Sequence, residues 1–265
     1  ENINILVIAD AKTPLSDLEE ERLNTYIKRG GNVLIAAEPN GRDAMIPIID
    51  KFGVALKEGI IVQRSKNFSA DLIINNLMPK MADKVSYVFE EITKYNQKIT
   101  MKGGIGLDYS KANGKGFKVT PLLQTNWRGC WSELETTDFD NEKVELNTQI
   151  GEIEKPYEMA IALSKLNAGK EQRIVILGDA DCFSNSEMFM KRDEVKANNS
   201  AFQMGVFEWL SNGEFPVDVR KPEFKDDGFK ISLSTFKIWK FILIWLLPLG
   251  IIITYFSIWF KRRRR

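Results

Sequence analysis

Runs of branched apolar residues alternate with amphipathic stretches over the first 63 residues of the chain. Three runs, Ile3–Asp10, Asn32–Pro39 and Gly59–Gln63, have the length and composition of buried strands. The stretches from Ser16 to Gly30 and from Ala44 to Leu56 predict helices between them. This order is the βαβ pattern, so we predict an α/β fold on a mainly parallel, open, Rossmann-like sheet.

The first predicted helix has a start signal and a stop signal. Ser16 and Glu19 match the S-x-x-E capping box, in which each side chain bonds a free backbone amide at the helix start. Gly30 and Gly31 follow the last apolar position and predict the end of the helix.

The pattern is less regular between residues 65 and 150, where Phe117–Glu133 predicts a strand followed by a loop. The segment KPYEMAIALSKLNAGK, residues 155–170, predicts a helix with Pro156 in its first position and Gly169 after its end. Arg173–Leu177 predicts another buried strand. A last helix of the body is predicted by an apolar face of Phe202, Val206, Trp209 and Leu210.

The C-terminal segment Phe241–Phe260 carries no charged residue. At about 1.5 Å per residue it spans about 30 Å, the hydrocarbon thickness of a bilayer, so we predict a transmembrane helix over residues 237–260. A helix buried in a soluble core is the alternative, but so long an apolar run closed by KRRRR exceeds what such a core needs. The residues that we assign to the anchor are Phe241, Trp245, Pro248, Trp259, Lys261 and Arg262.

The basic end of the chain predicts its orientation. The positive-inside rule places residues 261–265 in the cytoplasm and the body in the periplasm, on the other side of the inner membrane. No signal peptide precedes Glu1. We therefore expect the C-terminal part of a longer product, or a product whose leader was removed.

The net charge of +1 hides an asymmetry. All residues after Phe236 that carry charge are basic, and there are seven: Lys237, Lys240, Lys261 and the four arginines 262–265. Without these seven, 30 of the 37 bases remain against 36 acids, so the body carries about −6. We predict no nucleic-acid binding, because affinity for phosphate backbones requires a basic face.

Histidine is absent from the sequence. This excludes Ser-His-Asp and Cys-His catalytic sites and zinc sites that contain histidine. Carboxylate pairs, Ser-Lys nucleophiles and metal sites built from oxygen ligands remain compatible with the composition.

Acidic residues follow several predicted strands, where ligands bind in open α/β sheets. An acidic crevice there would suit a divalent cation with oxygen ligands. The interpretation that we favour is structural: Asp179 or Asp181 accepts backbone amides of the turn around Phe183–Ser186. The candidates for interaction or turn capping are Asp10, Glu38, Asp179, Asp181, Ser184 and Asn185. We expect no bound cofactor and no catalytic residue.

Two further features have simple interpretations. The glycine cluster 103–116 lacks the P-loop pattern, because Gly116 follows Lys115 and Tyr109 stands where the first glycine is required. We expect a hairpin with flexible turns and no ATP hydrolysis by this chain. Cys130 and Cys182 could form a disulfide outside the cytoplasm, and Cys182 could act as a nucleophile, but we favour two unpaired cysteines.

Several segments together resemble the GldG-type, gliding-motility-associated auxiliary subunits of ABC-2-type transporters. They occur in the order ILVIADAKTPLSDLEEERLNTYIKRGGNVLIAAEP, FKVTPLLQTNWRGCWSE, KPYEMAIALSK, RIVILGDADCFSNS and FEWLSNGEFPVDVR. The final apolar span with its arginine-rich end also fits, so the resemblance covers nearly the whole chain.

The resemblance implies a fold akin to class I glutamine amidotransferases, in a branch shared with intraflagellar transport subunits that lacks the catalytic residues. It also implies that the protein works together with a membrane permease and a separate cytoplasmic ATPase. In Bacteroidetes such proteins are associated with gliding and surface secretion, and related forms are fused to the permease.

We therefore predict an extracytoplasmic domain (1–215), a juxtamembrane linker (216–236), the transmembrane helix (237–260) and a cytoplasmic end (261–265). The predicted function is that of a non-enzymatic auxiliary component of an ABC transporter, docked on the permease or on a periplasmic protein. The alternatives are an anchored hydrolase or metal-dependent enzyme that uses the strand-end acids, and an anchored scaffold without a transporter.

Overall fold

The computed structural model describes residues 3–78, 87–167, 169–192, 194–214 and 233–263. The chain divides into two compact units, residues 1–217 and 218–265, each of which is described by itself. Most of the predicted linker, 216–236, and the last two arginines lie outside the described residues. The predicted division into four segments stays a prediction.

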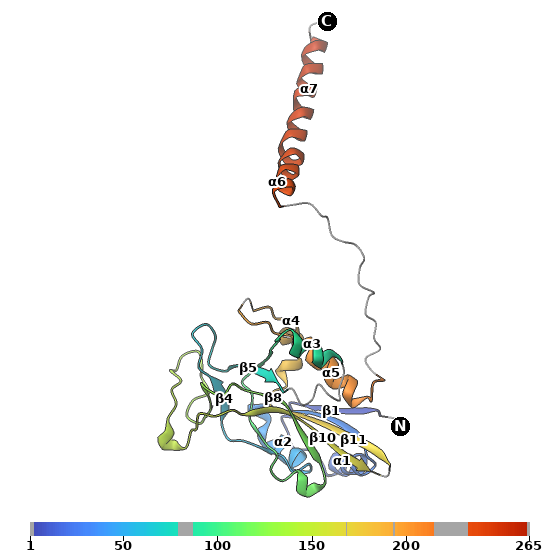
Figure 1. Ribbon diagram of the computed structural model, residues 1–265, viewed down its shortest axis with the longest axis vertical. Helices are drawn as coiled ribbons and strands as arrows, with labels where there is room; N and C mark the ends of the chain where they lie inside the picture. The colour runs from blue at the N-terminus through green and yellow to red at the C-terminus, as the bar shows by residue number, and fades with distance from the viewer. Residues whose placement is uncertain (1–2, 79–86, 168, 193, 215–232, 264–265) are drawn as a thin grey trace. The chain divides into compact units, whose positions relative to one another are not determined.

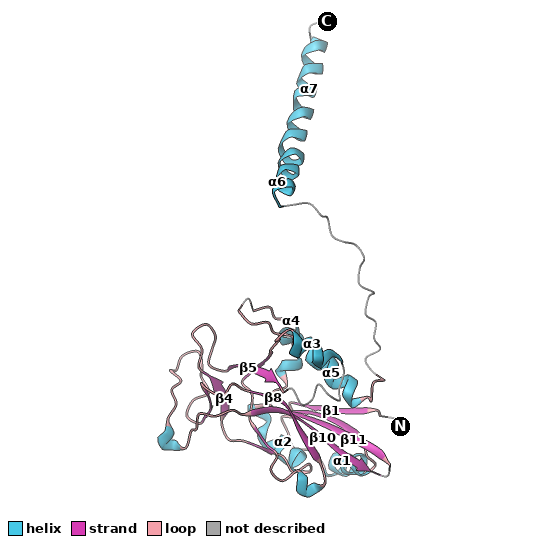
Figure 2. Ribbon diagram, viewed as in Figure 1, coloured by secondary structure: helices cyan, strands magenta, loops and turns pink. Residues whose placement is uncertain are grey.

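The first unit is built on a mixed sheet whose strands run in the order β1-β2-β11-β10-β8-β5-β6 (Figures 1 and 2). Parallel pairing joins β1 (Ile5–Ala9), β2 (Asn32–Ala36) and β11 (Lys170–Leu177). Every further pair is antiparallel, through β10 (Glu158–Asn167), β8 (Lys118–Gln124), β5 (Leu72–Leu77) and β6 (Ile99–Lys102). The predicted mainly parallel sheet is therefore wrong, although the α/β class is right.

Two small strand pairs lie beside this row. β3 (Ala55–Leu56) pairs with β7 (Leu107–Asp108), which also pairs with β10. β4 (Ile60–Gln63) pairs antiparallel with β9 (Cys130–Glu133) in a separate two-stranded sheet. The run Gly59–Gln63 is thus a strand as predicted, but β11 takes the place of the third parallel strand.

Helices cover both faces of the sheet (Figure 1). α1 (Asp17–Lys28) and α2 (Arg42–Asp50) pack on one face, while α3 (Tyr87–Lys94) and α5 (Asn199–Leu210) pack on the other. The short elements are α4 (Asn185–Phe189) and the 3₁₀ helices η1 (Pro39–Gly41), η3 (Asn113–Lys115), η4 (Thr148–Ile150) and η5 (Asp181–Phe183). α5 buries Phe202, Val206 and Leu210, as its apolar pattern predicts.

Strand β2 shows why the parallel strands appear in the sequence as continuous apolar runs. Val33 and Ile35 pack under α1 and α2, whereas Leu34 and Ala36 face the core of α3 and α5. A strand that is covered on both faces needs apolar residues at successive positions.

The capping box is present at the start of α1. The Glu19 amide donates to Ser16 Oγ (3.4 Å), and the Ser16 amide donates to Glu19 Oε2 (2.8 Å). The second helix is shorter than the predicted 44–56, because α2 ends at Asp50. Gly53 then adopts a φ of +75°, and a Cβ there would meet the Lys111 carbonyl oxygen at 2.7 Å.

The predicted helix at 155–170 is wrong, because this segment forms strand β10. Five consecutive residues from Met159 to Leu163 are buried, since β10 lies between β11 and β8 and is covered on both faces. Gly169, at φ +82°, belongs to the connection into β11 and does not end a helix. In Phe117–Glu133, β8 and its loop agree with the prediction, and β9 was not foreseen.

The second unit contains α6 (Leu233–Phe241), a π-helical turn η6 (Ile242–Leu246) and α7 (Leu247–Arg263) in direct succession. Residues Ile238–Arg263 form a helix long and apolar enough to cross a membrane, and none of its described side chains is buried. The π-helical turn ends two residues before Pro248, whose missing amide disturbs the regular α-helical bonding. This helix is a candidate membrane anchor, and its orientation stays a prediction.

Candidate functional site

The three parallel strands end at one edge of the sheet, and the predicted acids follow them there. Asp10 follows β1, Glu38 lies two residues after β2, and Asp179 follows β11 by two residues. The Asp10 amide donates to the Ala36 carbonyl at 2.9 Å. The Asp10 carboxylate forms an ion pair with Lys12 (2.6 Å), a residue of the same loop.

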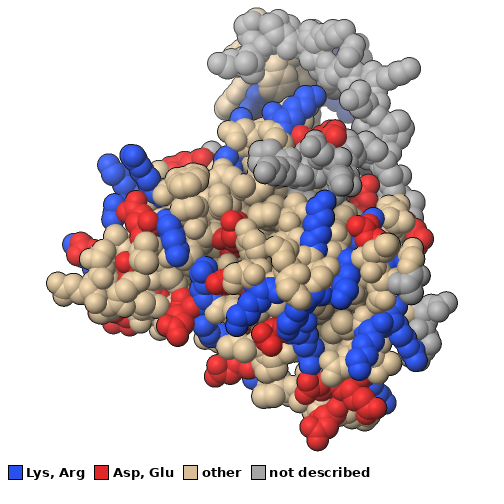
Figure 3. Space-filling model, turned by 60° about the horizontal axis from the view of Figure 1, so that its bottom comes forward, with Lys and Arg blue, Asp and Glu red and all other residues tan. Residues whose placement is uncertain are grey.

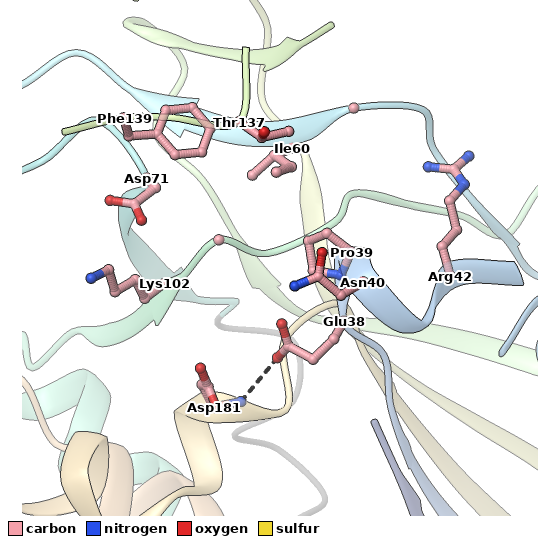
Figure 4. A pocket seen from close by; sticks show the side chains of 12 residues that line it. Glu38, Pro39, Asn40, Arg42, Ile60, Asp71, Lys102, Thr137, Phe139 and Asp181 are labelled. Atoms are coloured by element: carbon pink, nitrogen blue, oxygen red, sulfur yellow. Dashed lines mark hydrogen bonds between the residues drawn. The ribbon is translucent and has the colours of Figure 1, made fainter. Parts of the chain in front are cut away.

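Glu38 joins the ends of β2 and β11. Its Oε1 accepts hydrogen bonds from the backbone amides of Ala180 (2.6 Å) and Asp181 (3.1 Å), the second of which is drawn in Figure 4. These amides lie at the start of η5, where unpaired N–H groups require an acceptor. One carboxylate oxygen therefore holds the turn after β11 against the end of β2.

Asp179 is fully buried, and its carboxylate also accepts hydrogen bonds from backbone amides. Its Oδ2 accepts from the Lys102 amide (2.8 Å) at the end of β6, and its Oδ1 accepts from the Cys182 amide (3.1 Å). The capped amide lies one residue before the segment 183–186 that the sequence indicated. Asp179 thus links the turn after β11 to β6, the last strand in the order of the sheet.

Glu38 and Asp179 are in contact, and each changes the ionisation of the other. Burial raises the pKa of Asp179 well above its usual value, and repulsion from the Glu38 charge raises it further. Burial also raises the pKa of Glu38, although the amides of Ala180 and Asp181 and a hydrogen bond from Asp179 oppose this. The pair therefore holds a proton to a higher pH than two free carboxyl groups would.

The remaining predicted residues lie in the next turn. Ser184 is the N-cap of α4, where its Oγ accepts the Glu187 amide at 3.3 Å, and Asn185 is the first residue of that helix. The Asp181 side chain is exposed and lines a pocket. Among the six predicted residues, Glu38 thus contacts both Asp179 and the Asp181 amide, and the Ser184 amide donates to the Asp181 carbonyl at 2.8 Å.

A cavity of about 670 Å³ opens beside these strand ends (Figure 4). Part of its lining was predicted, namely Glu38 and Asp181. The charged residues that the sequence reasoning missed are Arg42, Asp71 and Lys102. Asp71 and Lys102 come from the segment 65–150, whose irregular pattern gave no sign of which residues would face the strand ends. The apolar wall includes Pro39, Ile60 and Phe139.

The enzyme alternatives call for a metal site or a reactive side chain at this edge. Among them, no three His, Cys, Asp or Glu residues converge on a point where a metal ion could be held. Cys130 and Cys182 are buried and unpaired. Burial raises the pKa of the Cys182 thiol well above its usual value, which keeps it protonated and a poor nucleophile.

The glycine cluster begins with a segment that crosses the end of β11. The Ile105 amide donates to the Gly178 carbonyl at 2.6 Å, and a Cβ on Gly178 would lie 1.8 Å from the Ile105 carbonyl oxygen. Further along the cluster, residues 113–115 form a 3₁₀ helix. The predicted flexible hairpin is therefore wrong: residues 103–106 pass over the strand end at backbone contact distance.

The surface in Figure 3 shows lysine and arginine side chains interspersed with aspartate and glutamate. On the face shown, acidic groups thus break up the positive charge that a phosphate backbone would need. The prediction that the protein does not bind nucleic acid stays a prediction.

Comparisons with known proteins place the first unit in a family. Residues 1–215 match the family model described as "ABC-type uncharacterized transport system". No curated protein matches the chain. The solved structure "mmIFT52 N-terminal domain" is similar with a TM-score of 0.52 at 16% identity, over 81% of this chain and 80% of that one, and shows the fold alone. On the family match, the chain belongs to the auxiliary components of ABC-type transport systems.

Proposed function

We propose that this chain is a non-enzymatic, membrane-anchored auxiliary component of an ABC transporter of the GldG type, with an amidotransferase-like fold. The body lies in the periplasm and docks on the permease or on a periplasmic protein. A separate cytoplasmic ATPase drives the cycle. The family match over residues 1–215 carries this proposal.

The anchor and its charges support the location. The helix Ile238–Arg263 is long enough to span a bilayer and ends in basic residues. Basic residues next to a span favour the cytoplasmic side. On this basis we propose that the C-terminus lies in the cytoplasm and the body in the periplasm.

The contacts of the strand-end acids support a non-enzymatic role. Asp179 accepts a backbone amide on each oxygen and Glu38 accepts two on Oε1, so the fold engages three of these four oxygens. A general base must instead have an oxygen within reach of a substrate proton. Further support comes from the Cys182 thiol, which burial keeps in its inactive, protonated form.

Affinity purification of the full chain from native membranes in a mild detergent tests the proposal. We expect a multi-span permease and a P-loop ATPase to co-purify in a constant ratio. A variant with residues 241–260 replaced by an unrelated single-span helix is the matched control, and it should retain less permease. Recovery of the chain without either subunit, even after cross-linking, would contradict the proposal and favour the scaffold alternative.

Two further measurements address location and chemistry. Protease added to intact spheroplasts should degrade the body, and its protection would contradict the periplasmic location. Asp179→Ala combined with Asp181→Ala tests the enzyme alternative. Loss of stability alone agrees with the capping role, whereas loss of a turnover at unchanged folding and assembly would show that the strand-end acids are catalytic.

A further inference from the structure

The pocket beside the strand ends holds more free negative than free positive charge. Among its described lining residues, the carboxylates are Glu38, Asp71 and Asp181, and the cations are Arg42 and Lys102. Arg42 is engaged by the fold, because its guanidinium donates to the carbonyls of Leu56 (3.0 Å) and Lys57. Among the described residues, Lys102 is therefore the one lining cation whose charged group makes no hydrogen bond or ion pair, and its side chain is exposed.

Asp71 is the least satisfied polar group of this pocket. Its residue is only 9% exposed, and its buried Oδ1 has no hydrogen-bond partner among the described residues. No ion pair within 4.0 Å joins it to Lys102 in the described part of the chain. A buried carboxylate oxygen without a hydrogen-bond partner is unfavourable unless something compensates its charge. Such a group calls for a specific explanation.

The local fold keeps Asp71 in place although its side chain is unsatisfied. Its carbonyl accepts the Gly103 amide at 2.9 Å, which ties it to the segment that crosses the end of β11. In Figure 4 its carboxylate lies in the pocket, on the same side as Lys102 and below Phe139. The carboxylate is thus presented to the cavity by the backbone.

The other walls suit an alkyl chain that ends in a positive charge. Phe139, Ile60 and Pro39 supply apolar surface, and the exposed Asp181 supplies a second carboxylate at the same cavity. Lysine and arginine side chains combine such a stem with a charged head. A small diamine has the same two parts.

We propose that this pocket binds an ammonium or guanidinium group through Asp71, with the attached alkyl chain against Phe139 and Ile60. The group is either a basic side chain of a partner protein or a small free amine. Cation binding goes beyond the proposed function and stands without it. Only the assignment to a partner protein's side chain rests on the proposed function.

Calorimetric titration of the full chain in detergent tests the proposal. The probes are cadaverine, agmatine and Nα-acetyl-lysine methylamide, and the neutral control probe is Nα-acetyl-norleucine methylamide. We expect saturable binding of cationic probes at millimolar concentration or below, and no binding of the neutral one. Asp71→Asn should weaken the cationic probes by about 10-fold or more, as expected for loss of a charge-assisted bond of about 1.5–3 kcal/mol.

Two variants control this experiment. Asp17→Asn removes an exposed carboxylate in the first turn of α1 and should leave binding unchanged. Lys102→Met removes the competing positive charge from an exposed side chain and should tighten cation binding by about threefold. Because its effect has the opposite sign and its site is exposed, Lys102→Met tests the proposal even if Asp71→Asn does not fold.

The probes also distinguish the source of the cation. Tighter binding of cadaverine or agmatine identifies a small amine, and tighter binding of the blocked lysine identifies a side chain of a partner protein. In the second case Asp71→Asn should also reduce permease co-purification. Cationic probes that do not bind the wild type up to about 10 mM, or that bind Asp71→Asn equally, would overturn the proposal, as would weaker binding to Lys102→Met.

Discussion

Buried carboxylates hold the backbone in two parts of the first unit, and the two arrangements differ in one respect. At the strand-end edge, Glu38 and Asp179 accept amides from the turn after β11 and from β6. At the two ends of the loop 134–152, Glu133 (the last residue of β9) and Glu152 play the same part, at 3% and 2% exposure. The strand-end acids contact each other, whereas each loop acid accepts only N–H donors.

The loop acids are satisfied by donors alone. Glu152 accepts the amides of Leu134 (2.9 Å) and Asn147 (2.7 Å), and Glu133 accepts the Trp131 indole N–H (3.1 Å). These donors compensate the negative charge of each loop acid. At the strand ends, burial raises the pKa of both carboxyls, and the charge of Glu38 raises that of Asp179 further. The loop acids therefore interact with donors alone, whereas the strand-end acids also interact with each other.

The largest effect is expected from Asp179→Ala. It leaves the buried amides of Lys102 and Cys182 without an acceptor, which should lower the free energy of unfolding by about 3 kcal/mol or more. Urea unfolding of the full chain in detergent, followed by near-ultraviolet circular dichroism, measures the change. Asp181→Asn, next to it and exposed, is the control and should change stability by less than about 0.5 kcal/mol. A loss below about 1 kcal/mol in Asp179→Ala would show that Asp179 does not hold the edge.

An intermediate and local effect is expected from Glu152→Ala. The amides of Leu134 and Asn147 lose their acceptor, at a cost of about 2 kcal/mol that falls on the loop rather than on the sheet. Hydrogen exchange should therefore accelerate by about 10-fold or more across 134–147 and stay unchanged in β11. Glu152→Gln keeps one acceptor oxygen and should show a smaller increase. Equal acceleration in β11 would mean that the two regions unfold together.

The smallest effect, and the sharpest test of the comparison, is the pH response of Glu38→Gln. The raised pKa values of Glu38 and Asp179 mean that the folded protein keeps a proton that the unfolded chain releases above about pH 4. Wild-type stability should therefore fall as pH rises from that value through the folded-state pKa. The glutamine can accept both amides and donate to ionised Asp179, so the fall should be flattened, by about 1 kcal/mol.

Unfolding midpoints at pH 5 and pH 8 measure this response. Asp17→Asn, which changes an exposed acid elsewhere, should retain the wild-type difference. If Glu38→Gln kept the full pH dependence, the raised pKa responsible for it would belong to another group.

The parallel part of the sheet could be predicted from the sequence because its signals are local. β1, β2 and β11 are short apolar runs, and the Ser16–Glu19 box marks the start of α1 within four residues. The rule that parallel strands end at one edge also placed the acids correctly. It could not reveal that Glu38 reaches the amides of residues 180 and 181, because these contacts join positions 142 and 143 residues apart.

The antiparallel part was missed because local patterns compete there. In β10 the run from Met159 to Leu163 is apolar at every position and rich in helix-forming residues, so its periodicity does not separate a central strand from a buried helix. Only the pairing with β8 and β11 decides the matter. The same holds for Asp71 and Lys102, whose place in the pocket follows from tertiary pairing of a segment with weak local signals.

The bare Cα of Gly178 has a consequence for how this fold can vary among relatives. Any side chain at this position would occupy the place of the Ile105 carbonyl, so a larger residue requires the middle segment to take another route. In an alignment, positions 105 and 178 should therefore change as a unit, together with the length of the stretch that joins β6 to β7. A relative with another residue at position 178 should therefore carry residues 103–106 along a different path. The pocket beside the strand ends should then have a different shape.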